Sequence, residues 1–205
     1  MRPTALAIGL AVTVEVSLAA AQTTSPAYRI TNARVTVLCP LTVGGSFEAR
    51  TSAAVGNLSG DISRSAAVST LAAVDGASLA LTGAIQVDLA TLETGIELRD
   101  RHMKDVYLEI SRGAGFATAR LEAISIDGAE GRTPFHGTLS LHGEQRPVSG
   151  VADLQGQRDG GVRVRARFPI SLAAFGIQPP RYLGAGVQDQ VEVQVTFTAM
   201  PLRSI

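Results

Sequence analysis

The chain is dominated by apolar residues that alternate with small or polar ones, the pattern of strands with one buried face. The alternation is cleanest over residues 190–197. Further strands are predicted over residues 28–38, 46–52, 78–89, 116–126, 134–141, 147–154 and 162–170, with reversals at Gly44-Gly45, 56–60, Asp75-Gly76, Asp127-Gly128 and Gly143-Glu144. About eight strands joined by short turns can close into an antiparallel barrel that holds one ligand. Residues 62–74 fit an edge strand and an irregular excursion equally.

Residues 93–104 interrupt this pattern, because they gather charge instead of alternating. Thr94 and Glu97 have the spacing of a capping box, which predicts a short helix that begins at Gly95. The helix is too short to be stable alone, so Ile96 and Met103 are expected to dock on the barrel. Pairs spaced four residues apart are predicted to stabilise its other faces: Glu97 with Arg101, Arg101 with Asp105, and Asp100 with Lys104.

Composition supports one domain with a proper core. The chain has 205 residues, 45% of them hydrophobic. Its 18 basic residues balance 18 acidic ones, and no basic block stands out, so no nucleic-acid partner is expected. The arginines at 163, 165 and 167 alternate with apolar residues and are expected to face water, in preference to forming a phosphate-binding row.

Residues 1–21 have the outline of a secretory signal peptide: an early Arg2, an apolar run and the triplet Ala19-Ala20-Ala21. We therefore expect a mature domain over residues 22–205 in the periplasm; an uncleaved N-terminal helix or anchor is the alternative. No later apolar run approaches about 20 residues, so the mature protein is not expected to span a membrane. Cys39 is the single cysteine, which excludes an internal disulfide, and we interpret it as a small buried hydrophobe.

Candidate chemistry is sparse. Arg99, Asp100 and His102 have the residue types of an oriented general base, but such residues also fix a segment through hydrogen bonds and ion pairs, and we favour that anchoring role. His136 and His142 lie six residues apart on one predicted strand, about 20 Å, too far to share a metal. Nucleophile elbows, phosphate loops and dinucleotide fingerprints are absent. No catalytic residue, metal or cofactor is therefore predicted.

Three stretches in order resemble the YceI-like family of lipocalin-like barrels that hold polyisoprenoid lipids. The first is Thr94-Gly95 with Arg99-Asp100 and His102-Met103. The second is 135–143 with Arg146-Pro147. The third runs from Phe168 and Ile170 through Phe175-Gly176-Ile177 to Gly186, Asp189 and Val191. Order and spacing agree over about half of the chain.

The chain departs from the family pattern in three places. Tyr28 is followed by Thr31, Asn32 and Ala33 where the family often has an Asp and a Ser or His-Ser pair, Phe116-Ala117 stands where the aromatic-Pro pair is usual, and residues 39–75 match poorly. These departures leave open whether the ligand and the barrel mouth are those common in the family.

The resemblance implies an all-β protein, an eight-stranded antiparallel lipocalin-like β-barrel with one or two short helices. It further implies an exported carrier for an isoprenoid-type lipid or quinone, without covalent chemistry, and the family commonly forms dimers. The residues expected at the ligand are Ile96, Met103, Phe116, Phe135, Leu139, Phe175, Val193 and Phe197. Two alternatives stay open: an acid/base enzyme acting on a lipid-like substrate through Asp100 and His102, and a protein-interaction module that binds no lipid.

Overall fold

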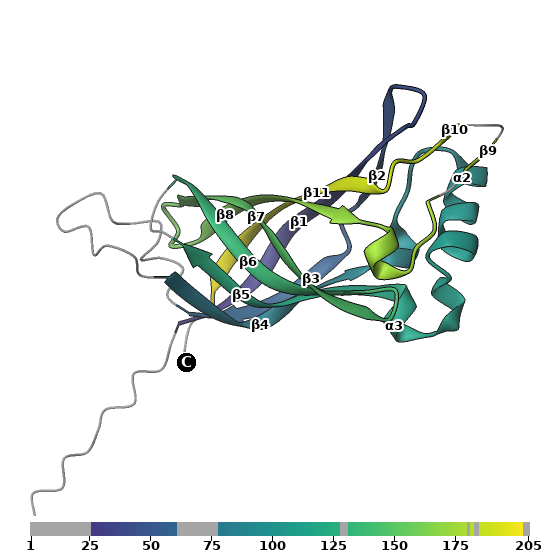
Figure 1. Cartoon of the computed structure of the whole chain (residues 1–205). Helices are drawn as coiled ribbons and strands as arrows, with labels where there is room; N and C mark the ends of the chain where they lie inside the picture. The colour runs from purple at the N-terminus through teal and green to yellow at the C-terminus, as the bar shows by residue number, and fades with distance from the viewer. Residues whose placement is uncertain (1–25, 61–77, 128–130, 180, 183–184, 203–205) are drawn as a thin grey trace, which may run out of the picture.

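The computed structural model describes residues 26–60, 78–127, 131–179, 181–182 and 185–202. These residues form a closed antiparallel barrel of eight strands with helical segments at one end (Figure 1), which confirms the predicted fold class. The strands are β1 (Ala27–Pro40), β2 (Ser46–Thr51), β3 (Ala54–Ser59), β4 (Ser78–Asp88), β5 (Thr118–Asp127), β6 (Gly131–Leu141), β7 (Glu144–Gly156), β8 (Val162–Ser171), β9 (Arg181–Tyr182), β10 (Ala185–Gly186) and β11 (Gln190–Pro201). The helical segments are η1 (Leu89–Thr91), α2 (Glu97–His102), η2 (Met103–Tyr107), η3 (Ile110–Arg112), α3 (Ala114–Ala117) and η4 (Ala173–Phe175).

Closure of the barrel comes from the pairing of its first and last long strands. The order is β11-β8-β7-β6-β5-β4-β3-β1, and β1 pairs back onto β11, with Tyr28 opposite Pro201 and Leu38 opposite Glu192. Strand β3 pairs with the beginning of β1, whereas β2 pairs with its second half, from Val35 to Pro40. The β1–β2 hairpin therefore extends past the end of the barrel proper (Figure 1).

The period-2 pattern places one face of each long strand inside. In β8, Val162, Val164, Phe168 and Ile170 are buried while the three arginines between them are exposed, which confirms the prediction that these arginines face water. Val191, Val193 and Phe197 on β11 follow the same rule. Because the inward faces of all the barrel strands converge, the apolar side chains form one continuous interior.

The reversal predicted at residues 56–60 is wrong, since residues 56–59 belong to β3 and pair with β4, and only Gly60 lies past the strand. Gly56 on β3 and Gly83 on β4 let the backbones of these two strands approach each other closely, and neither makes a turn. A Cβ on Gly56 would lie 2.3 Å from the Ala84 carbonyl oxygen, and one on Gly83 would lie 2.1 Å from that of Asn57. Leu58 points inward and is almost fully buried, so the segment carries core as well as turn-type residues.

The predicted capping box is also wrong. Helix α2 begins at Glu97 after Ile96, with no side-chain cap, because the Thr94 hydroxyl donates to Asp100 Oδ1 at 2.5 Å instead. The Glu97–Arg101 pair is confirmed at 3.0 Å. At Met103 the helix widens into the π-helical turn η2, which ends at Tyr107.

Several sequence-based expectations fall on residues outside the described part of the chain. These are the signal peptide over residues 1–21, residues 62–74, the turn at Asp75-Gly76 and Gly128 of the turn at Asp127-Gly128. Within the part that is described, no helix is long and apolar enough to cross a membrane.

Candidate ligand-binding cavity

The barrel encloses a cavity of about 960 Å³, near the upper end of the roughly 300–1,000 Å³ usual for ligand pockets. Every barrel strand contributes lining side chains, as do α2 and η2. Along β8 the lining runs from Val164 to Ile170, which at about 3.3 Å per residue is about 20 Å. The cavity is therefore long as well as large, a shape that suits an extended chain.

The lining is almost entirely aliphatic or aromatic. Its polar side chains are few: Cys39, Arg99, His102, Tyr107 and Arg181. No Asp or Glu of the described residues lines the cavity, so its ionisable groups are basic apart from one thiol and one phenol. Such walls offer non-directional contact along most of their length and charge at one end only.

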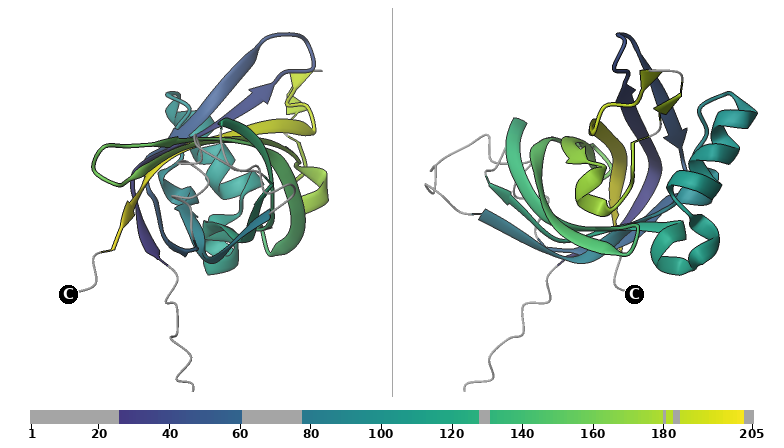
Figure 2. Two further views of the ribbon diagram at one scale, coloured as in Figure 1. Left: turned by 90° about the vertical axis from the view of Figure 1, so that its left-hand side faces the viewer. Right: turned by 45° about the vertical axis from the view of Figure 1, so that its right-hand side comes forward.

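The cavity opens at the end that carries the helical segments, called the mouth here. The only exposed residues in its lining are Ile96, Leu98, His102 and Arg181, all at this end. Figure 2 shows α2, the β1–β2 hairpin and β9–β10 grouped around it. The basic side chains therefore lie at the mouth, and the apolar part of the cavity extends from there into the barrel.

Cys39 and Arg99 lie together near the mouth. Burial raises the pKa of the Cys39 thiol to about 11, and the positive charge of Arg99 opposes part of that rise. The Arg99 guanidinium carbon lies 4.4 Å from the centroid of the Phe47 ring, a cation–π contact. Arg99 thus joins α2 to β2 while it faces the cavity.

Six of the eight residues expected at the ligand line this cavity: Ile96, Met103, Phe135, Leu139, Val193 and Phe197. Phe116 and Phe175 do not. Phe116 makes a T-shaped contact with His142 and lies under the Arg112 guanidinium, and Phe175, the last residue of η4, is buried in the core. Sequence periodicity identifies inward side chains but cannot separate those that line a void from those that fill the wall. That the six bind a ligand stays a prediction.

The three expected anchors behave differently from one another. Partial burial pushes the pKa of the Asp100 carboxyl upward, but hydrogen bonds from the Thr94 hydroxyl and backbone N–H, with the charges of Lys104 and Arg99, hold it below its ordinary value. A carboxylate of lowered pKa is a weak general base near neutral pH. His102 is exposed at the mouth and makes no hydrogen bond to Asp100 among the described contacts. Asp100 is therefore an anchor within the segment, and Arg99 contacts β2.

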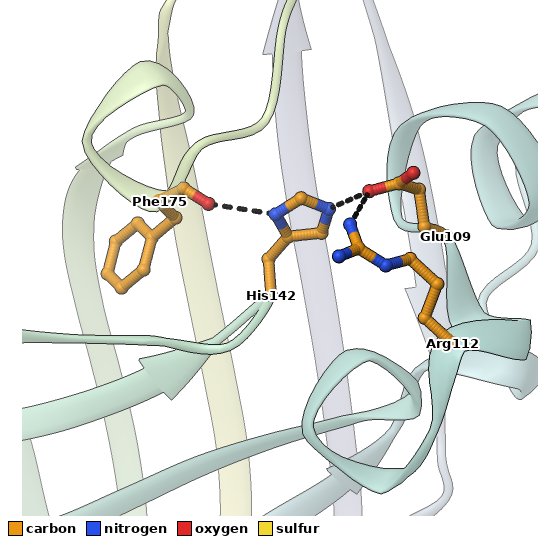
Figure 3. Close-up of polar contacts among 4 residues, drawn as sticks. All are labelled: Glu109, Arg112, His142 and Phe175. Carbon is orange, nitrogen blue, oxygen red and sulfur yellow. Dashed lines mark hydrogen bonds and ion pairs between the residues drawn. The ribbon is translucent and has the colours of Figure 1, made fainter.

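A cluster that sequence reasoning missed fastens the helical segments to the barrel (Figure 3). His142 Nε2 lies 3.1 Å from Glu109 Oε2, and Nδ1 lies 3.0 Å from the Phe175 carbonyl oxygen. Arg112 donates to the same Glu109 oxygen at 2.7 Å. Glu109 and His142 both have left-handed backbone conformations, φ 49° and 53°, which are uncommon outside glycine. His142 lies just past the end of β6, so the prediction that it shares one strand with His136 is wrong.

Metal-ligand geometry is not found in the described part of the chain, where no three His, Cys, Asp or Glu side chains come together in a suitable group. His136 instead contacts Ser149 and Asp127 on the outer surface.

Comparison with known families decides the assignment. The model of the YceI-like domain matches residues 28–199. The chain belongs to the YceI-like family. The motifs around Thr94-Gly95, residues 135–143 and residues 168–191 all lie within that match.

Two solved structures share the fold at low sequence identity. BcnA from Burkholderia cenocepacia superposes with a TM-score of 0.62 at 11% identity, covering 82% of this chain and 96% of its own. A polyisoprenoid-binding domain from Saccharophagus degradans, implicated in plant cell wall breakdown, gives 0.59 at 13% identity, covering 87% of this chain and 99% of its own. None of the curated proteins matches the chain.

Proposed function

We propose that this protein binds one long-chain isoprenoid-type lipid, a polyisoprenoid or an isoprenoid-quinone-like amphiphile, inside its barrel, for transport, storage or sequestration. The observation that carries the proposal is the long apolar cavity of about 960 Å³. Membership of the YceI-like family and the fold shared with a polyisoprenoid-binding domain support it.

Burial of the lipid's hydrocarbon chain in the cavity is sufficient to hold such a ligand. Each Å² of apolar surface removed from water contributes about 25 cal/mol, so a long hydrocarbon chain needs no directional contact along most of its length. Branched walls such as those of Val164 and Val193 accept methyl-branched units without a fixed register. The basic residues at the mouth then contact the polar end.

The site of action that we propose is the periplasm. The support is the signal-peptide outline of residues 1–21, which lie outside the described residues. Cell fractionation together with N-terminal sequencing of the mature chain tests this: a mature chain that begins near Gln22 in the periplasmic fraction is expected.

Organic extraction tests the ligand. The protein is purified from a bacterial host without detergent, its fold is checked by circular dichroism, and the chloroform–methanol extract is analysed by mass spectrometry. We expect about one isoprenoid lipid per chain. A folded protein that yields an empty extract and takes up no added polyprenyl lipid would contradict the proposal.

The same preparation separates the two alternatives. An enzyme acting through Asp100 and His102 predicts a chemically altered lipid after incubation, and loss of that change in His102→Ala. A protein-interaction module predicts partner capture by a protein free of lipid. Light scattering of the purified chain measures whether it forms the homodimer that the family resemblance implies.

A further inference from the structure

Large apolar side chains are exposed around the mouth. The exposed large hydrophobic residues of the described chain are Val43, Val55, Ile96, Leu98, Val106 and Leu202. Ile96 and Leu98 line the mouth itself, Val106 follows on η2, and Val43 lies in the hairpin that carries the lining residues Leu41 and Phe47. Four of the six therefore lie on the two segments that border the opening. We call Val43, Ile96, Leu98 and Val106 the apolar rim.

The tip of the hairpin that carries Val43 contains no charged residue. Residues 41–47 read Leu-Thr-Val-Gly-Gly-Ser-Phe, and Val43 is 67% exposed. The last residues of β1, Cys39 and Pro40, pair with β2 and no longer with β11. The Pro40 carbonyl oxygen accepts a hydrogen bond from the Gln188 N–H, and the tip of the hairpin projects past the barrel beside α2 (Figures 1 and 2). An uncharged projecting tip with an exposed valine costs little to place in the interfacial region of a bilayer.

The ionised side chains that line the mouth have one sign. Arg99, Arg181 and His102 line the opening, while Arg101 on the outer side of α2 is paired with Glu97. Glu97, Asp100 and Asp105 balance the charge of the helical segment itself, so the excess of positive charge is local to the opening. Phosphate groups of lipids are complementary to basic side chains placed beside an apolar rim.

We propose that the mouth docks on a phospholipid bilayer, with the apolar rim in the interfacial layer and Arg99 and Arg181 at the phosphates. The proposal rests on the proposed function, because a water-insoluble lipid must pass between the cavity and a membrane. In the docked state the apolar lining is continuous with the acyl region, and the lipid moves without crossing water.

The absence of tryptophan from the sequence gives a direct probe of this docking. Val43→Trp and Val55→Trp each introduce one indole, the first on the rim and the second at a matched exposed position on β3. On addition of vesicles containing equal parts of phosphatidylglycerol and phosphatidylcholine, we expect the emission of Val43→Trp to shift to the blue and to be quenched by brominated acyl chains. Val55→Trp is expected to show neither change. Equal responses, or none with either variant, would overturn the proposal.

A charge introduced on the apolar rim tests the strength of the contact. Val43→Asp and Val106→Asp alter the rim but line no part of the cavity, so lipid content is expected to stay at the wild-type value while vesicle co-sedimentation falls at least fivefold. Val55→Asp is the control and should sediment like the wild type. Retention of full vesicle binding by both rim variants refutes the docking surface, even where extraction still finds lipid.

The two proposals fail separately. Protein that binds vesicles through the rim but yields no extractable lipid contradicts the cavity function and leaves the docking surface standing. A lipid-loaded protein that ignores vesicles contradicts the docking surface alone, and would direct attention to a protein acceptor at the rim.

Discussion

The imidazole of His142 lies between Glu109 Oε2, 3.1 Å from Nε2, and the Phe175 carbonyl oxygen, 3.0 Å from Nδ1. Both partners are hydrogen-bond acceptors. One side chain thus connects the helical segments, the β6–β7 turn and η4. A change that breaks the contacts of His142 therefore weakens the attachment of the helical segments to the end of the barrel.

Removal of this contact should cost stability. We expect His142→Ala to lower the free energy of unfolding by about 2 kcal/mol, because two hydrogen bonds are lost and the Glu109 carboxylate loses a partner. Urea denaturation measures it. His136→Ala removes an exposed pair with Asp127 and is expected to change stability by less than about 0.5 kcal/mol. Equal losses for the two variants would contradict the assignment.

Stability should fall in acid. The hydrogen bond from Arg112, aided by His142, holds the pKa of Glu109 below its ordinary 4.5, and the Ser171 hydroxyl and Ala173 N–H hold that of Asp189 below 3.8. Both values are lower in the folded than in the unfolded state, so the contribution is complete above about pH 5 and is lost as the pH falls through the folded values. The melting temperature is expected to be level from pH 7 to 5 and to drop below about pH 4.5, less steeply in Glu109→Gln.

Cys39 should be a slow nucleophile in the native protein. With its pKa raised to about 11 from 9.0, the thiolate fraction at pH 8 is about a hundredfold lower than that of a free thiol. Alkylation by iodoacetamide is expected to slow by about that factor relative to the urea-unfolded chain, and to slow further in lipid-loaded protein because Cys39 lines the cavity. Native rates within a few-fold of the unfolded rate would contradict the buried position.

Two glycines should respond oppositely to alanine. A Cβ on Gly150 would lie 2.2 Å from the Arg167 carbonyl oxygen, so Gly150→Ala forces the backbones of β7 and β8 apart and is expected to cost more than about 3 kcal/mol. A Cβ on Gly115 in α3 would contact only Gly143 Cα, at 4.0 Å, an ordinary van der Waals distance, so Gly115→Ala is expected to be neutral or stabilising by up to about 1 kcal/mol. Thermal unfolding of the pair measures both.

Filling the cavity should exclude the ligand. Ala166 and Arg165 are neighbours on β8 with opposite directions, one into the cavity and one into water. Ala166→Trp is expected to reduce bound lipid at least tenfold by mass spectrometry, since the indole occupies the space of the chain. Arg165→Trp adds the same group outside and should leave lipid content unchanged. Full loading of Ala166→Trp would place the ligand elsewhere.

The strict alternation of apolar and polar residues predicts β8 and β11 from the sequence, because each strand has one solvent-exposed face and one buried face. The family motifs predict the barrel. The position of Gly56 in a strand cannot be predicted in this way, since a glycine that allows a neighbouring backbone to approach closely looks the same in sequence as one that makes a turn. Thr94 was misjudged because its hydroxyl had two acceptable partners, and only the folded segment shows that Asp100 is the one. The contact between His142 and Glu109 joins residues 33 apart on irregular backbone, where no period exists to read.

The pairing of Tyr28 with Pro201 has a practical consequence. The beginning of β1 and the end of β11 meet at the pole of the barrel opposite the mouth, so a tag, surface tether or fusion partner attached there leaves the opening unobstructed. A short linker from residue 202 to residue 26, with new ends placed at Gly160, should give a circular permutant that keeps the whole strand order. Immobilised by that pole, the barrel would present its opening to added membranes in a single orientation.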